Sequence, residues 1–146
     1  MKQEYCKNMN QYKFEDIISG MEESFTIQIT EEMMDSFLKI TGDVNPLHND
    51  EDYAREKGFS SRVVYGMLTA SFLSTLAGVF LPGKYCLIHG IEAEFPKPVY
   101  IGDILTVTGT VAEKDERFRE FKLRVVIRNE RREQVCRAKM RLGVKE

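Results

Sequence analysis

The chain has 146 residues, of which 42% are hydrophobic and 30% are charged, as is typical of a globular domain that needs no disulfide or metal to fold. Its 21 basic and 23 acidic residues leave a formal net charge of -2. This near balance excludes a general nucleic-acid binder, which needs a basic stripe to displace counterions. The three cysteines (Cys6, Cys86 and Cys136) form no C-x-x-C pair, so neither a disulfide framework nor a metal site is predicted, and a cytoplasmic location is expected.

The N-terminal third of the chain predicts a lead-in, a strand and two helices. Residues 1–20 are expected to be a lead-in to a single domain that spans residues 1–146. Alternating apolar residues predict a strand over 24–29. Thr30 is the predicted N-cap of a helix that ends at Gly42. The apolar stripe of this helix is predicted to contain Met33, Phe37, Leu38 and Ile40. A shorter helix is predicted over 50–57.

Residues 63–81 contain no charged side chain, and 19 residues are enough for a helix to cross a bilayer. The stretch also contains Thr69, Ser71 and Ser74, and no other part of the chain supports insertion. We therefore predict a helix buried on all sides in a protein core, starting near Gly66, and no association with a membrane.

The C-terminal half predicts four strands joined by short turns, over 85–95, 104–111, 118–127 and 134–142. Consecutive strands with short connections form antiparallel sheets. An uncharged helix next to such a sheet must be wrapped by it. The expected fold class is therefore α+β, with one antiparallel sheet around one long central helix.

Asp43 and His48 are the first candidates for chemistry. Gly42 and Pro46 make a continuous helix across this segment unfavourable. In a tight turn, a carboxylate and an imidazole five residues apart can converge on one water molecule and polarise it from both sides. The alternative is a plain helix-to-helix turn in which Asp43 and Asn45 cap backbone N–H groups while His48 is exposed.

Gly66 is a candidate for binding a polarised carbonyl oxygen. The first N–H groups of a helix have no intrahelical acceptor, and glycine allows a ligand to approach the backbone closely. An uncharged wall that excludes water would strengthen such a bond. The alternative is that Gly66 serves only as a helix-capping glycine.

Three segments together resemble a known enzyme family. Residues 42–50 read GDVNPLHND and resemble the hydratase motif of the MaoC-like, R-specific enoyl-CoA hydratases. Residues 65–71, which read YGMLTAS, and the LPG turn at 81–83 resemble the central helix of that family and the turn after it. Residues 95–103, which read FPKPVYIGD, resemble its F-x-x-P-V-x-x-G-D element. The resemblance extends over about residues 23–144.

The resemblance implies a hot-dog fold, commonly paired into a homodimer. It also implies roles for five residues. Asp43 and His48 match the catalytic dyad, and Gly66 matches the residue whose backbone N–H binds the thioester oxygen. Asn45 is expected to order the turn, and Ser74 to support the dyad by hydrogen bonding. These roles imply reversible hydration of trans-2-enoyl thioesters to R-3-hydroxyacyl thioesters in fatty-acid-type metabolism.

The chain departs from the family at Tyr65, where many members carry a histidine. Tyrosine preserves an aromatic group that can form hydrogen bonds, so the departure bears on substrate preference more than on the reaction. The acyl pocket is expected to be lined by Met67, Phe72, Leu73 and Leu76. No metal or redox cofactor is expected, because CoA or an acyl carrier protein enters as part of the substrate. Basic residues near the C-terminus are interpreted as solvated strand faces or as a rim for an anionic substrate tail.

Two other functions remain open at this point. A hot-dog acyl thioesterase would use a carboxylate on the central helix, and residues 63–81 contain none. A non-catalytic subunit that binds acyl thioesters would keep the fold without turnover, although both dyad side chains are present here. The second histidine, His89, is interpreted as a core or interface residue.

Overall fold

The structure of the protein, a computed structural model, describes residues 8–146. The first seven residues of the predicted lead-in, Cys6 among them, lie outside the described residues. The rest of the lead-in contains one 3-10 turn, Phe14–Asp16. Phe14 and Ile17 are buried, so this part of the lead-in packs against the core.

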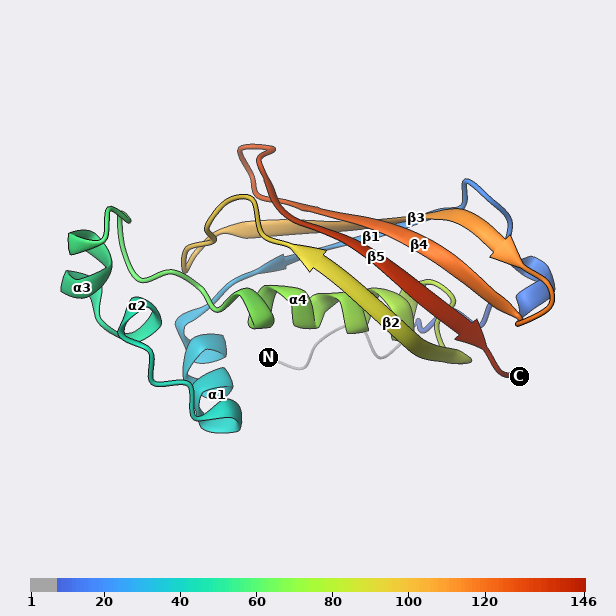
Figure 1. The fold of residues 1–146 in the computed structure, drawn as a ribbon, viewed down its shortest axis with the longest axis horizontal. Helices are drawn as coiled ribbons and strands as arrows, with labels where there is room; N and C mark the ends of the chain where they lie inside the picture. The colour runs from blue at the N-terminus through green and yellow to red at the C-terminus, as the bar shows by residue number, and fades with distance from the viewer. Residues whose placement is uncertain (1–7) are drawn as a thin grey trace.

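The sheet has five antiparallel strands in the order β1-β3-β4-β5-β2 (Figure 1). The strands are β1 (Glu22–Gln28), β2 (Cys86–Glu94), β3 (Ile104–Asp115), β4 (Glu120–Arg128) and β5 (Gln134–Val144). On β4, buried and exposed positions alternate as the sequence predicts. Strand β2, however, pairs with β5 and not with the next strand in sequence, so it forms an edge of the sheet.

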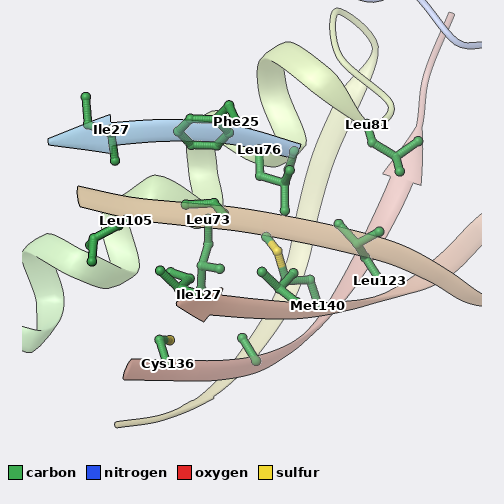
Figure 2. Packing of buried hydrophobic residues seen from close by; sticks show 14 of the residues in the cluster. Phe25, Ile27, Leu73, Leu76, Leu81, Leu105, Leu123, Ile127, Cys136 and Met140 are labelled. Carbon is green, nitrogen blue, oxygen red and sulfur yellow. The ribbon is translucent and has the colours of Figure 1, made fainter. Parts of the chain in front are cut away.

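The central helix α4 (Gly66–Thr75) lies along one face of the sheet and continues into a π-helical turn, Leu76–Phe80 (Figure 1). Leu73 and Leu76 are fully buried in the core between helix and sheet (Figure 2). Gly109 on β3 permits this close packing, because a Cβ there would lie 2.7 Å from Leu76 Cδ2. The predicted α+β arrangement of one antiparallel sheet and one central helix is confirmed.

The prediction that this helix is buried on all sides is wrong. Met67 is 67% exposed, and Ser71 and Ser74 are also exposed, so one face of α4 is uncovered in the single chain. Within residues 8–146, no helix is long and apolar enough to cross a membrane.

Three further helices gather beyond one end of the sheet: α1 (Glu31–Thr41), α2 (Pro46–Asn49) and α3 (Glu51–Glu56) (Figure 1). The predicted caps of α1 are confirmed, since Thr30 Oγ1 accepts a hydrogen bond from Met33 N at 3.2 Å and Gly42 adopts φ 69°. The predicted stripe is wrong at Ile40, which is 81% exposed, whereas Met34 is buried. The helix meets the core over a narrower stripe than its apolar sequence suggests.

Candidate active site

The turn after α1 is held by its own polar side chains. Asp43 Oδ1 accepts a hydrogen bond from Asn45 N at 3.1 Å. Asn45 is the N-cap of α2, and its Oδ1 accepts from Leu47 N at 2.9 Å. Pro46 follows as the first helical residue, where its missing N–H leaves no intrahelical bond unmade. The segment is therefore a tight turn followed by one helical turn, and it carries both Asp43 and His48.

Within residues 8–146, one ring nitrogen of His48, Nε2, forms no hydrogen bond and can face a ligand. Its Nδ1 lies 2.6 Å from the carbonyl oxygen of Val63. A carbonyl only accepts hydrogen bonds, so Nδ1–H donates and Nε2 of the neutral ring keeps its lone pair. Val63 N in turn donates to Leu47 O at 3.1 Å, which ties α2 to the segment before α4. The imidazole is thus fixed in orientation and presents Nε2 as a proton acceptor.

A pocket of about 320 Å³ opens beside His48 and the N-terminus of α4. His48, Gly66 and Thr69 contribute to its wall together with apolar residues of other segments. These apolar residues include Phe59, Val64, Phe95, Pro98, Val99 and Val135. Within residues 8–146, no acceptor binds the N–H of Gly66, the first residue of α4. The pocket therefore combines a proton acceptor, a free backbone donor and an apolar wall.

Thr69 is an unusual member of this wall. It is 1% exposed, and its Oγ1 has no hydrogen-bond partner among the residues that the structure describes. A buried hydroxyl without a partner typically costs about 1–3 kcal/mol. Nothing in its sequence context singles Thr69 out from the other helix hydroxyls, so its state is visible only in the packed structure.

Asp43 lies on the same turn as His48 but is exposed and does not line the pocket. In the described part of the chain, no hydrogen bond or ion pair joins its carboxylate to His48. The link between them is indirect, because Tyr65 donates a hydrogen bond to the Asp43 carbonyl and its ring lies against the His48 ring at a tilted angle. Convergence of Asp43 and His48 on one water molecule stays a prediction.

Several other predicted site residues lie outside this pocket. Ser74 is exposed and forms no hydrogen bond with the dyad in the described chain. Of the residues predicted to line the acyl pocket, Met67 is exposed, Phe72 is half-buried, and Leu73 and Leu76 belong to the core. Their role as an acyl pocket stays a prediction. The wall residues Phe95, Pro98 and Val99 come from the FPKPV segment, which is recognisable in the sequence only as a family signature.

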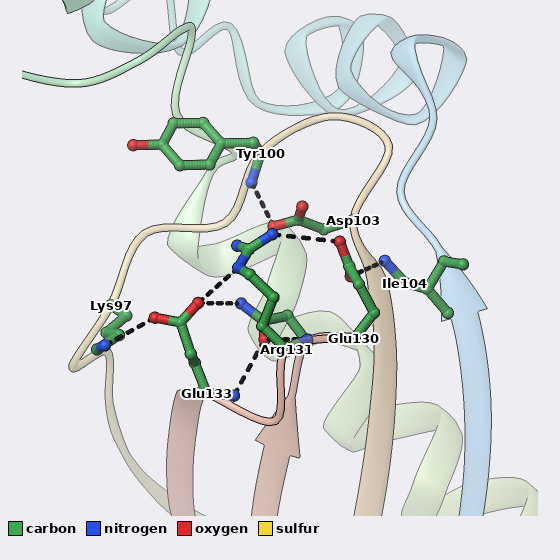
Figure 3. Close-up of polar contacts among 8 residues, drawn as sticks. Lys97, Tyr100, Asp103, Ile104, Glu130, Arg131 and Glu133 are labelled. Atoms are coloured by element: carbon green, nitrogen blue, oxygen red, sulfur yellow. Dashed lines mark hydrogen bonds and ion pairs between the residues drawn. The ribbon is translucent and has the colours of Figure 1, made fainter.

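This segment is fastened to the hairpin between β4 and β5 (Figure 3). Lys97 Nζ lies 2.7 Å from Glu133 Oε2, and Arg131 Nε lies 2.7 Å from Glu133 Oε1. Hydrogen bonds from Lys97, Arg131 and Asn129 lower the pKa of Glu133 from its ordinary value of 4.5 to about 2. Asp103 Oδ2 holds the other end of the segment by accepting from Tyr100 N at 3.0 Å. One wall of the pocket is therefore anchored at Lys97 and just after Val99.

The cysteines and His89 lie in surroundings that do not indicate a catalytic role. Cys136 is buried and Cys86 is half-buried, and burial raises the pKa of both thiols to about 11. His89 is exposed on β2, where its Nδ1 pairs with Glu120, so it is not a core residue, and its role as an interface residue stays a prediction. Among residues 8–146, no group of three or more His, Cys, Asp or Glu residues is arranged to hold a metal ion.

Comparison with known proteins gives matches over most of the chain. The family model described as "MaoC like domain" matches residues 15–132. An (R)-specific enoyl-CoA hydratase from Rhodospirillum rubrum is 40% identical over 105 residues, which are 69% of this chain and 73% of the relative. A 3-hydroxybutyryl-CoA dehydratase from Methylorubrum extorquens is 37% identical over 100 residues, 68% of this chain and 64% of the relative. The unliganded structure of R-hydratase PhaJ1 from Pseudomonas aeruginosa gives a TM-score of 0.86 at 27% identity, covering 93% of this chain and 87% of that one.

Proposed function

The chain belongs to the MaoC-like domain family, with its hot-dog fold, and on that basis we propose that it is a hydro-lyase that reversibly hydrates trans-2-enoyl thioesters to R-3-hydroxyacyl thioesters. The names of its relatives describe this chemistry in those proteins. The observation that carries the proposal is local: the His48 ring and the free Gly66 N–H line one pocket, and Asp43 lies on the His48 turn.

In the hydration direction, the Asp43 carboxylate takes a proton from a water molecule while the oxygen of that water attacks C3 of the enoyl group. His48 Nε2 orients that water, and the protonated dyad then delivers a proton to C2. Acid–base participation of this kind is typically worth about 10²–10⁴-fold in rate. One water is consumed, with its hydroxyl on C3 and a proton on C2, so no oxidant or reductant is needed.

Gly66 N–H is the proposed donor to the thioester oxygen, which becomes negatively charged when the C2 carbanion delocalises into an enolate. Loss of one such donor typically lowers kcat by about 10²–10³-fold. We propose no metal or cofactor, because proton transfer and this one backbone donor suffice for the chemistry. CoA or an acyl carrier protein takes part only as the substrate's carrier.

The proposal is tested with Asp43→Asn and His48→Gln, assayed by the loss of enoyl absorbance of crotonyl-CoA. Each variant is expected to lose at least about 10²-fold in kcat with an unchanged circular dichroism spectrum. Asp52→Asn on α3 is the matched control, because it makes the same change on a neighbouring exposed aspartate. Wild-type activity in either dyad variant would show that the dyad is wrongly assigned.

The same assay separates the alternatives. Release of free CoA thiol from crotonyl-CoA would identify a thioesterase, which residues 63–81 do not favour because they contain no carboxylate. Binding of acyl-CoA without turnover would identify a non-catalytic subunit.

We further propose that two copies of the chain pair through β2 and that the protein acts in the cytoplasm. Leu87, Ile88 and Ile91 on this edge strand are 47%, 42% and 46% exposed. Such a group of exposed apolar side chains is unusual on an edge strand that borders solvent. Met67 adds exposed apolar surface on the uncovered face of α4. Cys86 and Cys136 form no disulfide within residues 8–146, which supports a reducing compartment.

A further inference from the structure

Tyr65 immediately precedes Gly66 and is 2% exposed, yet its hydroxyl reaches a residue 22 positions earlier in the chain. The hydroxyl donates to the backbone carbonyl of Asp43 at 2.9 Å. Its oxygen can then accept from Asn49 Nδ2 at 3.3 Å. A buried phenol requires partners of this kind, and here both belong to the turn and the one-turn helix that carry the dyad.

Asn49 closes a small ring of hydrogen bonds around the same carbonyl. Its Nδ2 lies 3.3 Å from Asp43 O and 3.0 Å from Asn45 O, in addition to the contact with Tyr65. The Asp43 carbonyl therefore has two neighbouring donors, one from α2 and one from the start of α4. Because the carboxylate extends from the same backbone unit, holding this carbonyl fixes the point from which the carboxylate reaches the substrate.

The aromatic ring of Tyr65 contacts the other half of the dyad. Its centroid lies 4.3 Å from that of the His48 ring, with 33° between the planes. The Tyr65 ring also packs against Phe37 of α1, with centroids 4.8 Å apart. Tyr65 thus touches Asp43 through its hydroxyl and His48 through its ring, and its peptide bond leads directly into the Gly66 N–H.

We propose that Tyr65 and Asn49 are positioning residues that set the Asp43 carboxylate relative to His48 and the Gly66 N–H. The inference rests on the proposed hydratase function. Neither side chain lines the 320 Å³ pocket, so neither is expected to contribute to acyl-thioester binding. Asp43 needs this support because it is exposed and, in the part of the chain that the structure describes, its carboxylate bonds only to the nearby Asn45 N.

Loss of the hydrogen bonds from Tyr65 and Asn49 to the Asp43 carbonyl is therefore expected to lower kcat and leave KM nearly unchanged. Tyr65→Phe keeps the ring contacts and removes only the hydroxyl. A misplacement of about 1 Å in a reacting group can lower the rate by up to about 10²-fold, so a loss of about tenfold or more in kcat is expected. Asn49→Ala is expected to act in the same direction. The double variant should fall short of the product of the two single losses, since both side chains act on one carbonyl.

Tyr53→Phe is the matched control, because the Tyr53 hydroxyl on α3 forms no hydrogen bond within residues 8–146. Kinetics on crotonyl-CoA are measured well below the melting temperature of each variant, so that partial unfolding does not lower the apparent kcat. Amide hydrogen exchange at Asn45 and Leu47 provides a second readout that needs no catalysis. Exchange there is expected to be faster in Tyr65→Phe and unchanged in Tyr53→Phe.

A wild-type kcat in Tyr65→Phe would overturn the proposal, whatever the exchange rates show. A loss expressed mainly in KM would also overturn it, because it would place Tyr65 in substrate binding. If the wild-type protein does not hydrate crotonyl-CoA, the proposed function fails separately. In that case, unchanged amide exchange at Asn45 and Leu47 in Tyr65→Phe would overturn the positioning role of Tyr65, and faster exchange would support it.

Discussion

Gly66 lies where the backbone of α4 begins and where the ring of Phe95 leaves space for a methyl group. A Cβ at Gly66 would lie 3.6 Å from the Phe95 ring carbons, an ordinary van der Waals contact. We therefore expect Gly66→Ala to fold with an unchanged or higher melting temperature. The methyl group would occupy the space beside the N–H, so kcat/KM for crotonyl-CoA is expected to fall by about 10²-fold.

Parallel thermal melts and initial-rate kinetics check this separation of fold from activity. Gly78→Ala serves as the control, because a Cβ there would meet no atom from another part of the described chain within 4 Å. If Gly66→Ala retained full activity, the thioester oxygen would have to bind elsewhere.

Thr69 offers a test of stability in the same wall. Its buried hydroxyl has no partner in the described chain, and valine has nearly the same shape without the polar atom. Thr69→Val is expected to raise the free energy of unfolding by about 1 kcal/mol, as a penalty of this kind is removed. For a chain of this size that corresponds to a rise of about 3 °C in melting temperature, measured without ligand. A fall in melting temperature would mean that the hydroxyl is satisfied in solution.

The sequence predicts some contacts of the site residues and not others. Asp43, Asn45 and His48 share one short motif, so their local turn is predictable from Gly42 and Pro46. The contact between Tyr65 and the Asp43 carbonyl is not predictable, since it depends on how α2 meets the start of α4. Local rules specify the turn, and tertiary packing specifies its neighbours.

At the scale of elements, the approach of α4 to the sheet depends on Gly109 in β3. A Cβ there would lie 2.7 Å from Leu76 Cδ2 and 3.0 Å from Leu123 Cδ2, both in fully buried residues. Gly109→Ala is expected to lower the free energy of unfolding by about 1–3 kcal/mol through overpacking. Urea denaturation should show a lower midpoint with an unchanged slope. Adding Leu76→Val should recover part of the loss, and the absence of any recovery would contradict this packing.

Most elements follow from local signals, whereas their pairing does not. Thr30 and Gly42 delimit α1, and the alternation over 120–128 marks β4. The pairing of β2 with β5 brings together segments about 50 residues apart, and nothing in the β2 sequence specifies that partner. The exposure of Ile40 has the same origin, because the buried face of a helix depends on what packs against it.

The ion pair of Lys97 with Glu133 joins the FPKPV segment to the β4–β5 hairpin and makes the stability of the folded state depend on pH. Because the pKa of Glu133 is lowered from 4.5 to about 2, its ionised form stabilises the folded state. That contribution is complete above pH 4.5 and is lost as the pH falls towards 2. Glu133→Gln should therefore melt below wild type at pH 7, and the difference should shrink between pH 4.5 and 2. A difference that grows on acidification would contradict the assignment.

At the scale of the whole molecule, the uncovered edge at β2 and the exposed face of α4 argue for a second copy. An edge strand offers unpaired backbone groups, and natural monomers commonly protect such edges with charged side chains. On β2, exposed Glu92 and Glu94 stand at one end, and Leu87, Ile88 and Ile91 place apolar surface along the rest of the strand. Pairing of two β2 strands would extend the sheet across both copies and cover this surface.

Ile91→Lys tests this arrangement, because a lysine on an edge strand opposes pairing with another strand. Sedimentation equilibrium is expected to show the wild type at twice the chain mass of 16.9 kDa and Ile91→Lys shifted towards a single chain. Ile40→Lys makes the same change at an 81% exposed position on α1 and should leave the mass unchanged. If Ile40→Lys separated the copies and Ile91→Lys did not, the interface would lie on the helical end of the molecule and not along β2. If hydration activity in Ile91→Lys fell together with the measured mass, the active site would be complete only in the dimer. The exposed face of α4, with Met67 and Ser74, would then form part of that site.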